Sequence, residues 1–153
     1  ADKLDHWQFY QARNIREEIA KSTLVQLRLQ AIAATPAQAV AYQQQITVYE
    51  ALAKDQVDVG VLHVPTIKPL DLDTILRECS RSGRLVVVAE NHSEIGGLCE
   101  AVGTGLLAAG VAPKFRRIAL PDAFLDAGAL PTLHDRYGIS ASVMSTTIKG
   151  WLA

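Results

Sequence analysis

The stretch that decides the fold is VVVAENHSEIGGLCEAVGTGLLAAGV, residues 86–111. Its β-branched beginning predicts a strand over residues 84–90, and the uniform apolarity indicates that neither face of this strand meets water. A glycine pair, Gly96-Gly97, then leads into small and apolar residues that predict a helix over 95–110. Such a passage from strand to helix is typical of α/β folds, in which ligands often bind beyond the carboxyl ends of the strands.

Further strands and helices alternate around this junction. The sequence predicts strands over residues 57–64 (VDVGVLHV) and 115–121 (FRRIALP). It also predicts three more helices: one capped by Asp71 and ended by Gly83, one over 130–138, and one capped by Ser140. The alternation implies an α/β fold in three layers, with a mainly parallel sheet and right-handed crossovers. Three strands make a thin sheet, which indicates that the first strand of the fold is missing.

Residues 1–55 have a different composition, with no glycine and with Pro36 as the only proline. Helix-forming residues dominate. We expect one helix over 3–33 and a second over 36–54, with Thr35 as its cap. The first carries apolar residues at helical spacing, which are Ile15, Ile19, Val25, Leu29 and Ile32. The predicted organisation is a helical hairpin for oligomerisation, residues 1–55, followed by an α/β domain, residues 56–153.

Composition excludes several classes of protein. The 153 residues, 49% of them hydrophobic and 20% charged, suit one compact domain or one domain with an appendage. A formal net charge of −1 gives no basis for binding nucleic acid or an anionic membrane. No apolar run approaches the roughly 20 residues that a membrane helix needs. Cys79 and Cys99 lack metal-type spacing and nothing has the pattern of a signal peptide, so we expect a cytoplasmic chain without membrane insertion.

The glycines of the junction are the first candidate site. Gly96 and Gly97 fit neither of the glycine-rich phosphate-binding motifs, and no lysine or arginine lies between Arg84 and Lys114 to meet a phosphate. Glycine also lets a backbone approach its neighbours closely. We therefore favour the structural interpretation, in which the pair lets the start of the helix lie against the sheet.

Glu90, Asn91 and His92 could supply an acid, an amide and a base. The nearest nucleophiles are Ser93, which lacks a nucleophile-elbow context, and Cys99, which with His92 gives too few ligands for a tetrahedral metal site. A carboxylate that accepts hydrogen bonds from loop N–H groups is the more common arrangement. We predict no catalytic, cofactor-binding or metal-binding residue. The alternative is a small-ligand crevice formed by Glu90, His92, Gly96 and Gly97.

Asp122 and Asp126 lie beyond the last predicted strand, and no basic residue or metal ligand is near them in the sequence. They suggest no site by themselves. No motif for nucleotide, metal or acyl-transfer chemistry is therefore present.

Four stretches, in this order and spacing, resemble the C-terminal domain of the transketolase family: VDVGVLHVPTIKPLD, VVVAENHSEIGGLCEAV, FRRIALPDAFLDAG and LPTLHDRYGIS. The resemblance covers about residues 47–152. Two departures stand out. Cys99 occupies a position that is usually glycine in the family, and the family's first strand is replaced by TPAQAVAYQQQI, residues 35–46, which is predicted to be helical.

This resemblance implies a fold without a cofactor-binding motif. In the family, thiamine diphosphate and Mg²⁺ are held between two other domains, and the C-terminal domain supports packing and dimerisation. The chain is thus expected to bind no cofactor itself and to act as a non-catalytic structural or assembly domain. As a C-terminal part of a transketolase, it would take part in ketol-group transfer only with the missing thiamine-binding domains.

The first half has a separate likeness. DHWQFYQARNIREEIAKSTL resembles a stretch of an uncharacterised bacterial membrane-associated protein family, over about residues 2–34. That likeness implies a helical, self-associating element, so we expect a homo-oligomer held by the N-terminal helices. Two unrelated likenesses that meet within a helical region are unusual for a natural gene and indicate a chimera, whether recombined, designed or fused.

Overall fold

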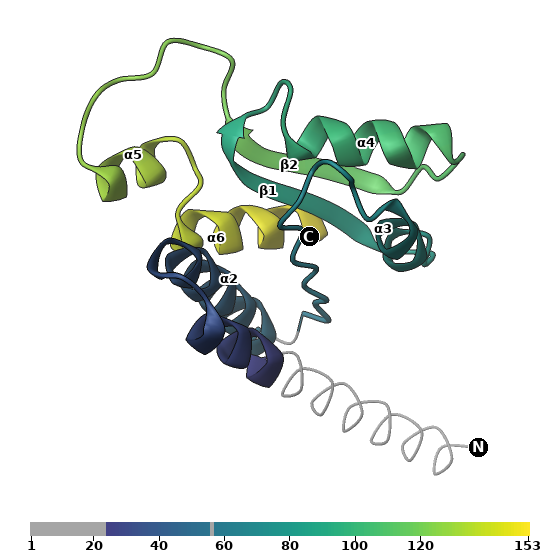
Figure 1. Ribbon diagram of the computed structural model, residues 1–153, viewed down its shortest axis with the longest axis horizontal. Coiled ribbons are helices and arrows are strands. Elements are labelled where there is room, and N and C mark those ends of the chain that lie inside the picture. Colours follow the sequence, from purple (N-terminus) through teal and green to yellow (C-terminus); the bar gives the residue numbers. More distant parts are fainter. Residues whose placement is uncertain (1–23, 56) are drawn as a thin grey trace. The chain divides into compact units, whose positions relative to one another are not determined.

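The computed structural model describes residues 24–55 and 57–153, which form two compact units that divide between Val61 and Leu62. Figure 1 colours the described residues from purple, at residue 24, to yellow at the C-terminus. Most of the first predicted helix lies outside the described residues. Residues 24–33 are helical, as expected for its last part.

The first unit contains this helical segment and α2, Pro36–Lys54, whose predicted bounds are confirmed. Oε1 of Gln38 accepts hydrogen bonds from the backbone N–H of Thr35 at 3.1 Å and from its hydroxyl at 2.9 Å, which fixes the start of α2. An ion pair between Arg28 and Glu50 at 2.8 Å joins the two helices. The two helices therefore form the expected hairpin over residues 24–54.

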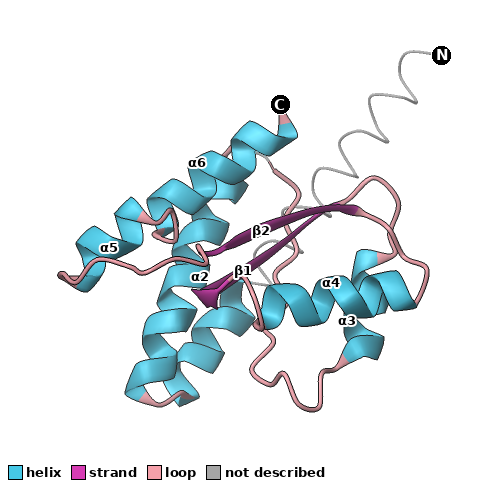
Figure 2. Cartoon of the chain, turned by 90° about the horizontal axis from the view of Figure 1, so that it is seen from above, coloured by secondary structure: helices cyan, strands magenta, loops and turns pink. Residues whose placement is uncertain are grey.

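The second unit is an α/β arrangement whose described elements are α3 (Leu72–Cys79), β1 (Leu85–Ser93), α4 (Leu98–Ala108), β2 (Lys114–Leu120), α5 (Leu130–Arg136) and α6 (Ala141–Leu152). The two strands pair in parallel. Figures 1 and 2 show α3 and α4 on one face of this sheet and α6 on the other, so the unit has three layers. The predicted α/β fold class is confirmed.

The core of this unit lies between β1 and the pair of helices on its face. Its buried members come from α3, β1 and α4, and they are Ile75, Val88, Cys99, Val102 and Leu106. Val88 of β1 is buried in this core, but Leu85, Val86 and Val87 are half-buried and Ala89 is exposed. The expectation that neither face of this strand meets water is therefore wrong. Cys99 is only 1% exposed, so a side chain in place of glycine is accommodated inside the core.

Polar caps set helix boundaries at two of the positions expected from the sequence. Asp71 accepts a hydrogen bond from the N–H of Thr74 at 3.1 Å, and the hydroxyl of Ser140 accepts one from Val143 at 3.5 Å. The end predicted for α3 at Gly83 is wrong. This helix ends at Cys79, where the hydroxyl of Ser80 donates a hydrogen bond back to the carbonyl of Leu76 at 2.6 Å.

The strand predicted over 57–64 is also wrong, because this segment has no regular secondary structure. Along residues 57–62 the side chains do alternate between half-buried and exposed, as the period of two suggested. Alternation shows only that one face of an extended chain is more buried than the other. A β-strand also requires a neighbouring strand for its backbone hydrogen bonds. The sheet of the described residues accordingly has two strands and not three.

Candidate functional site

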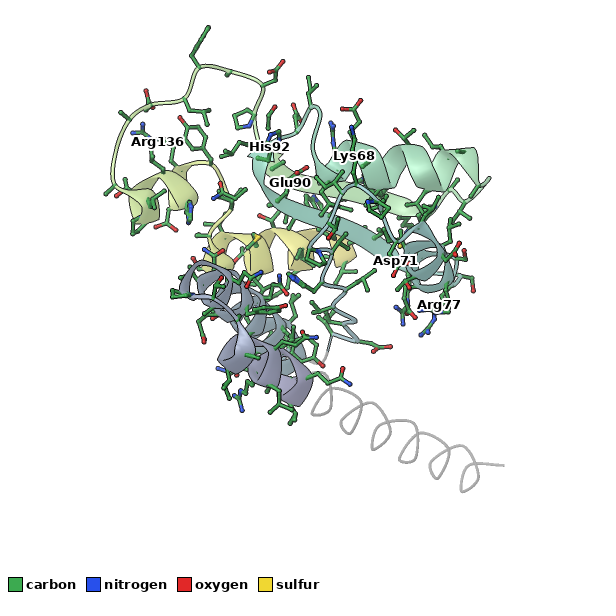
Figure 3. All side chains as sticks on the ribbon, viewed as in Figure 1. Lys68, Asp71, Arg77, Glu90, His92 and Arg136 are labelled. Carbon is green, nitrogen blue, oxygen red and sulfur yellow. The ribbon has the colours of Figure 1, made fainter. Side chains whose placement is uncertain are left out.

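The candidate residues lie at the carboxyl end of β1, where the register of the sheet changes. Ala89 pairs with Ile118, but the next pair joins Ser93 to Leu120, so the intervening residues of β1 outnumber those of β2. Such a bulge bends a strand and redirects its side chains. Figure 3 shows Glu90 and His92 at this end of β1.

Glu90 caps helix α4. Its Oε2 accepts a hydrogen bond from the backbone N–H of Leu98, and its Oε1 accepts one from that of Cys99, both at 2.7 Å. Each carboxylate oxygen therefore binds one of the N–H groups that a helix leaves unpaired in its first turn. The expected arrangement, a carboxylate on backbone N–H groups, is present.

Two opposing effects act on the pKa of Glu90. Burial raises it, whereas the hydrogen bonds from Cys99 and Leu98 and the nearby imidazole of His92 lower it, and the net result is a pKa below the usual value of 4.5. The carboxyl group is therefore held as the anion that the helix terminus stabilises. A general acid at neutral pH requires the opposite shift.

The two glycines are required for different reasons. Gly96 has φ +78°, a left-handed conformation that L side chains rarely adopt, and a Cβ there would meet nothing within 4 Å. Gly97 has an ordinary extended backbone, but a Cβ there would lie 2.7 Å from Cδ and Oε1 of Glu90. The left-handed turn at Gly96 also explains why α4 begins at Leu98 and not at the predicted residue 95.

A second carboxylate completes this helix start. Glu100, in the first turn of α4, accepts a hydrogen bond from the backbone N–H of Gly96 at 2.6 Å. The sequence signal was present, because an acidic residue three positions after an N-cap commonly bonds back to the preceding backbone. The glycines before it suggest a phosphate site instead, so this role of Glu100 was not predicted.

The other polar residues of the junction do not form a catalytic set. The ring of His92 is exposed, and its Nδ1 lies 3.0 Å from the carbonyl oxygen of Ser93. The hydroxyl of Ser93 accepts a hydrogen bond from the N–H of Ile95 at 3.2 Å. Both contacts are to local backbone groups, so neither side chain is arranged to activate the other.

Cys99 is buried and its Sγ lies 3.5 Å from the carbonyl oxygen of Val88. Burial, together with the hydrogen bond and negative charge of Glu90, raises the pKa of this thiol to about 12. The thiolate is the nucleophilic and metal-binding form of cysteine. Cys99 is therefore a core residue without the properties of a reactive thiol.

The loop between β2 and α5 is fixed at Asp126. Its backbone N–H donates to the hydroxyl of Tyr137 at 3.0 Å, and its carboxylate pairs with Arg136, which Figure 3 labels. Asp126 has no basic residue near it in the sequence, but α5 places Arg136 beside it in the folded chain. Asp122 is exposed.

Within residues 24–55 and 57–153, no group of three or more histidine, cysteine, aspartate and glutamate side chains could hold a metal ion. No helix in the same ranges is both long and apolar enough to cross a membrane.

Two known families match parts of the chain. Residues 38–144 match the family described as "Transketolase, C-terminal domain". The chain belongs to the transketolase C-terminal domain family. Residues 1–58 match a second family, a domain of unknown function (DUF4337). The two matches share residues 38–58, which include most of α2, and so they overlap where the sequence suggested that two likenesses meet.

Several relatives share this transketolase C-terminal domain. An uncharacterized transketolase family protein (y4mN) of Sinorhizobium fredii is 65% identical over 104 residues, which cover 67% of this chain and 30% of the relative. A 1-deoxy-D-xylulose-5-phosphate synthase of Thermus thermophilus is 42% identical over 58% of the chain and 14% of its own length. A 6-deoxy-6-sulfo-D-fructose transketolase subunit (SqwH) of Clostridium sp. is 36% identical over 60% and 28%. The chain thus spans less than a third of these relatives.

Thiamine diphosphate, the cofactor of the related enzymes, does not fit the junction. A diphosphate at a helix N-terminus needs free N–H groups and a positive potential. Here the first two N–H groups of α4 are bonded to Glu90, and its negative charge would repel a phosphate. The transketolase C-terminal domain of this chain offers no anion site at that helix.

Proposed function

We propose that this chain is a non-catalytic structural domain of a transketolase-type protein, which supports packing and assembly and binds no cofactor itself. The observation that carries the proposal is the Glu90 carboxylate, bonded at 2.7 Å to the N–H groups of Leu98 and Cys99. A ligand at the carboxyl end of β1 would have to displace this carboxylate. Glu90 and Gly97 are then parts of the architecture and not of a binding site.

Membership of the family supports a second candidate function. The relatives include proteins named as a synthase and as a transketolase subunit, and this chain spans 14% and 28% of their lengths. Under this proposal the chain contributes to ketol-group transfer only when it is joined to thiamine-binding domains. The small-ligand crevice at Glu90, His92, Gly96 and Gly97 is the weaker alternative, because the chain's own carboxylate occupies it.

An assay of the isolated chain tests the structural role against the small-ligand crevice. The purified chain is incubated with thiamine diphosphate, Mg²⁺ and a ketose-phosphate donor, and we expect no turnover above background and no change in melting temperature with the cofactor. Turnover that follows the purified chain would refute the structural role. Stabilisation by thiamine diphosphate that is lost in Glu90→Gln or His92→Ala would instead support the crevice.

A further inference from the structure

The helical segment over residues 24–33 is apolar on two opposite sides. Leu27 is 4% exposed and belongs to the core. Val25, Leu29 and Ile32, at spacing i, i+4, i+7, lie about 140–200° around the helix from Leu27, because successive residues advance by about 100°. These three side chains, the outer stripe, are 53%, 61% and 82% exposed.

Leu27 on the inner side is buried, whereas the outer stripe has no partner among residues 24–55 of its own unit. The ion pair of Arg28 with Glu50 ties the segment to α2 in the hairpin. A helix that is apolar on one face needs one partner, and a helix that is apolar on both faces needs a second.

The chemistry of the outer stripe indicates the kind of partner. Membrane-surface helices flank their apolar face with unpaired lysine and arginine. Within residues 24–33, Arg28 is the basic residue, and its charge is paired with Glu50, while Gln26 and Gln30 are uncharged. Such a neutral face suits another neutral helix, and an identical face meets it without a repulsion of like charges.

We propose that the outer stripe is the interface with a second copy of this chain. The spacing of Val25, Leu29 and Ile32 is that of alternating core positions in paired helices, where each side chain fits between those of the facing helix. In a dimer with a two-fold axis the same patch of both copies meets, so the stripe of one copy would pack against the stripe of the other. This dimer is independent of the role of Glu90, so that role can be refuted without affecting it.

The test is the mass of the full chain in solution. By light scattering after size-exclusion chromatography at micromolar concentration, we expect twice 16.6 kDa for the wild type. Leu29→Glu with Ile32→Glu should give the monomer mass, because two carboxylates in an apolar interface lack partners. Leu29→Ala with Ile32→Ala should weaken the dimer by at least about tenfold.

Leu107→Glu is the matched control, because Leu107 is a 72% exposed leucine in α4 of the second unit, and this variant should remain a dimer. Circular dichroism confirms that each variant is folded. A monomeric wild type, or dissociation by Leu107→Glu as well, would overturn the proposal. A monomer that sediments with vesicles of neutral or anionic lipid, and loses this property with the two glutamates, would assign the stripe to lipid and also overturn it.

Discussion

The carboxylate of Glu90 occupies the space in which a side chain at position 97 would lie. A Cβ on Gly97 would be 2.7 Å from both Cδ and Oε1 of Glu90, although the backbone of Gly97, with φ −104°, suits any residue. The end of β1 and the start of α4 therefore fit together because the carboxylate of Glu90 fills the space that a side chain on Gly97 would need. This pair is best tested by changing its members singly and together.

Gly97→Ala should lower the free energy of unfolding by about 1–3 kcal/mol, because the alanine methyl forces Glu90 away from the N–H groups of Leu98 and Cys99. In a Glu90→Ala background the same change should alter the free energy of unfolding little, since there is no carboxylate for the methyl group to displace. Urea denaturation of the wild type, both single variants and the double variant gives the coupling free energy. Equal costs in the two backgrounds would contradict this arrangement.

Glu90→Gln should destabilise the chain by about 1–3 kcal/mol at pH 7, because glutamine has one acceptor oxygen for two N–H groups and no charge. The folded pKa of Glu90 is below 4.5, so its contribution is present above pH 4.5 and is lost as the pH falls through the folded pKa. The difference between wild type and variant should thus shrink in acid. Thermal melts from pH 7 to pH 3 measure it.

His92→Ala provides a control for the same experiment, because His92 is exposed and its ring contacts the backbone of Ser93. We expect a change in the free energy of unfolding within about 0.5 kcal/mol. A loss as large as that of Glu90→Gln would show that the imidazole has a structural role of its own.

The two cysteines should resist modification in the folded chain, Cys99 most of all. Cys99 is 1% exposed with a pKa of about 12, and burial with the charge of Glu78 also raises the pKa of the half-buried Cys79. In a Cys79→Ser variant at pH 8, a thiol reagent should label Cys99 only after denaturation. Rapid labelling of this variant when folded would contradict the buried position.

Leu106→Ala and Phe124→Ala should differ sharply in stability. Leu106 is 2% exposed in the core beside Val102, whereas Phe124 in the loop after β2 is fully exposed. Leu106→Ala should lower the free energy of unfolding by about 2–5 kcal/mol, whereas Phe124→Ala should leave it almost unchanged. Chemical denaturation of the two variants measures both values. A large loss of stability in Phe124→Ala would show that the Phe124 side chain is buried against another part of the protein.

Much of the fold was predictable because its signals are local. The caps Asp71 and Ser140 each bond to an N–H three residues later, so the sequence holds both partners of each interaction. The strand over 57–64 failed for the opposite reason. Its alternation was correct, but the neighbour that a strand requires is a property of the whole sheet.

The candidate site was predictable in part for the same reason. That Glu90 would accept hydrogen bonds from backbone N–H groups follows from a carboxylate at a strand end, although the donors belong to the first turn of α4 and not to the loop. The need for glycine at position 97 could not be predicted from the sequence, because it depends on where the Glu90 side chain lies in the folded chain. The pairing of Arg136 with Asp126 was missed because α5 folds back across the loop.

The cap of α4 also has a consequence for the order of events during folding. Glu90 and its donors are eight and nine residues apart, so closing this loop costs little chain entropy. The pairing of β1 with β2 must instead join residues from opposite sides of α4. The junction can therefore close first and act as the nucleus, in which case Glu90→Gln slows refolding in stopped-flow experiments, whereas changes in α6 mainly speed unfolding.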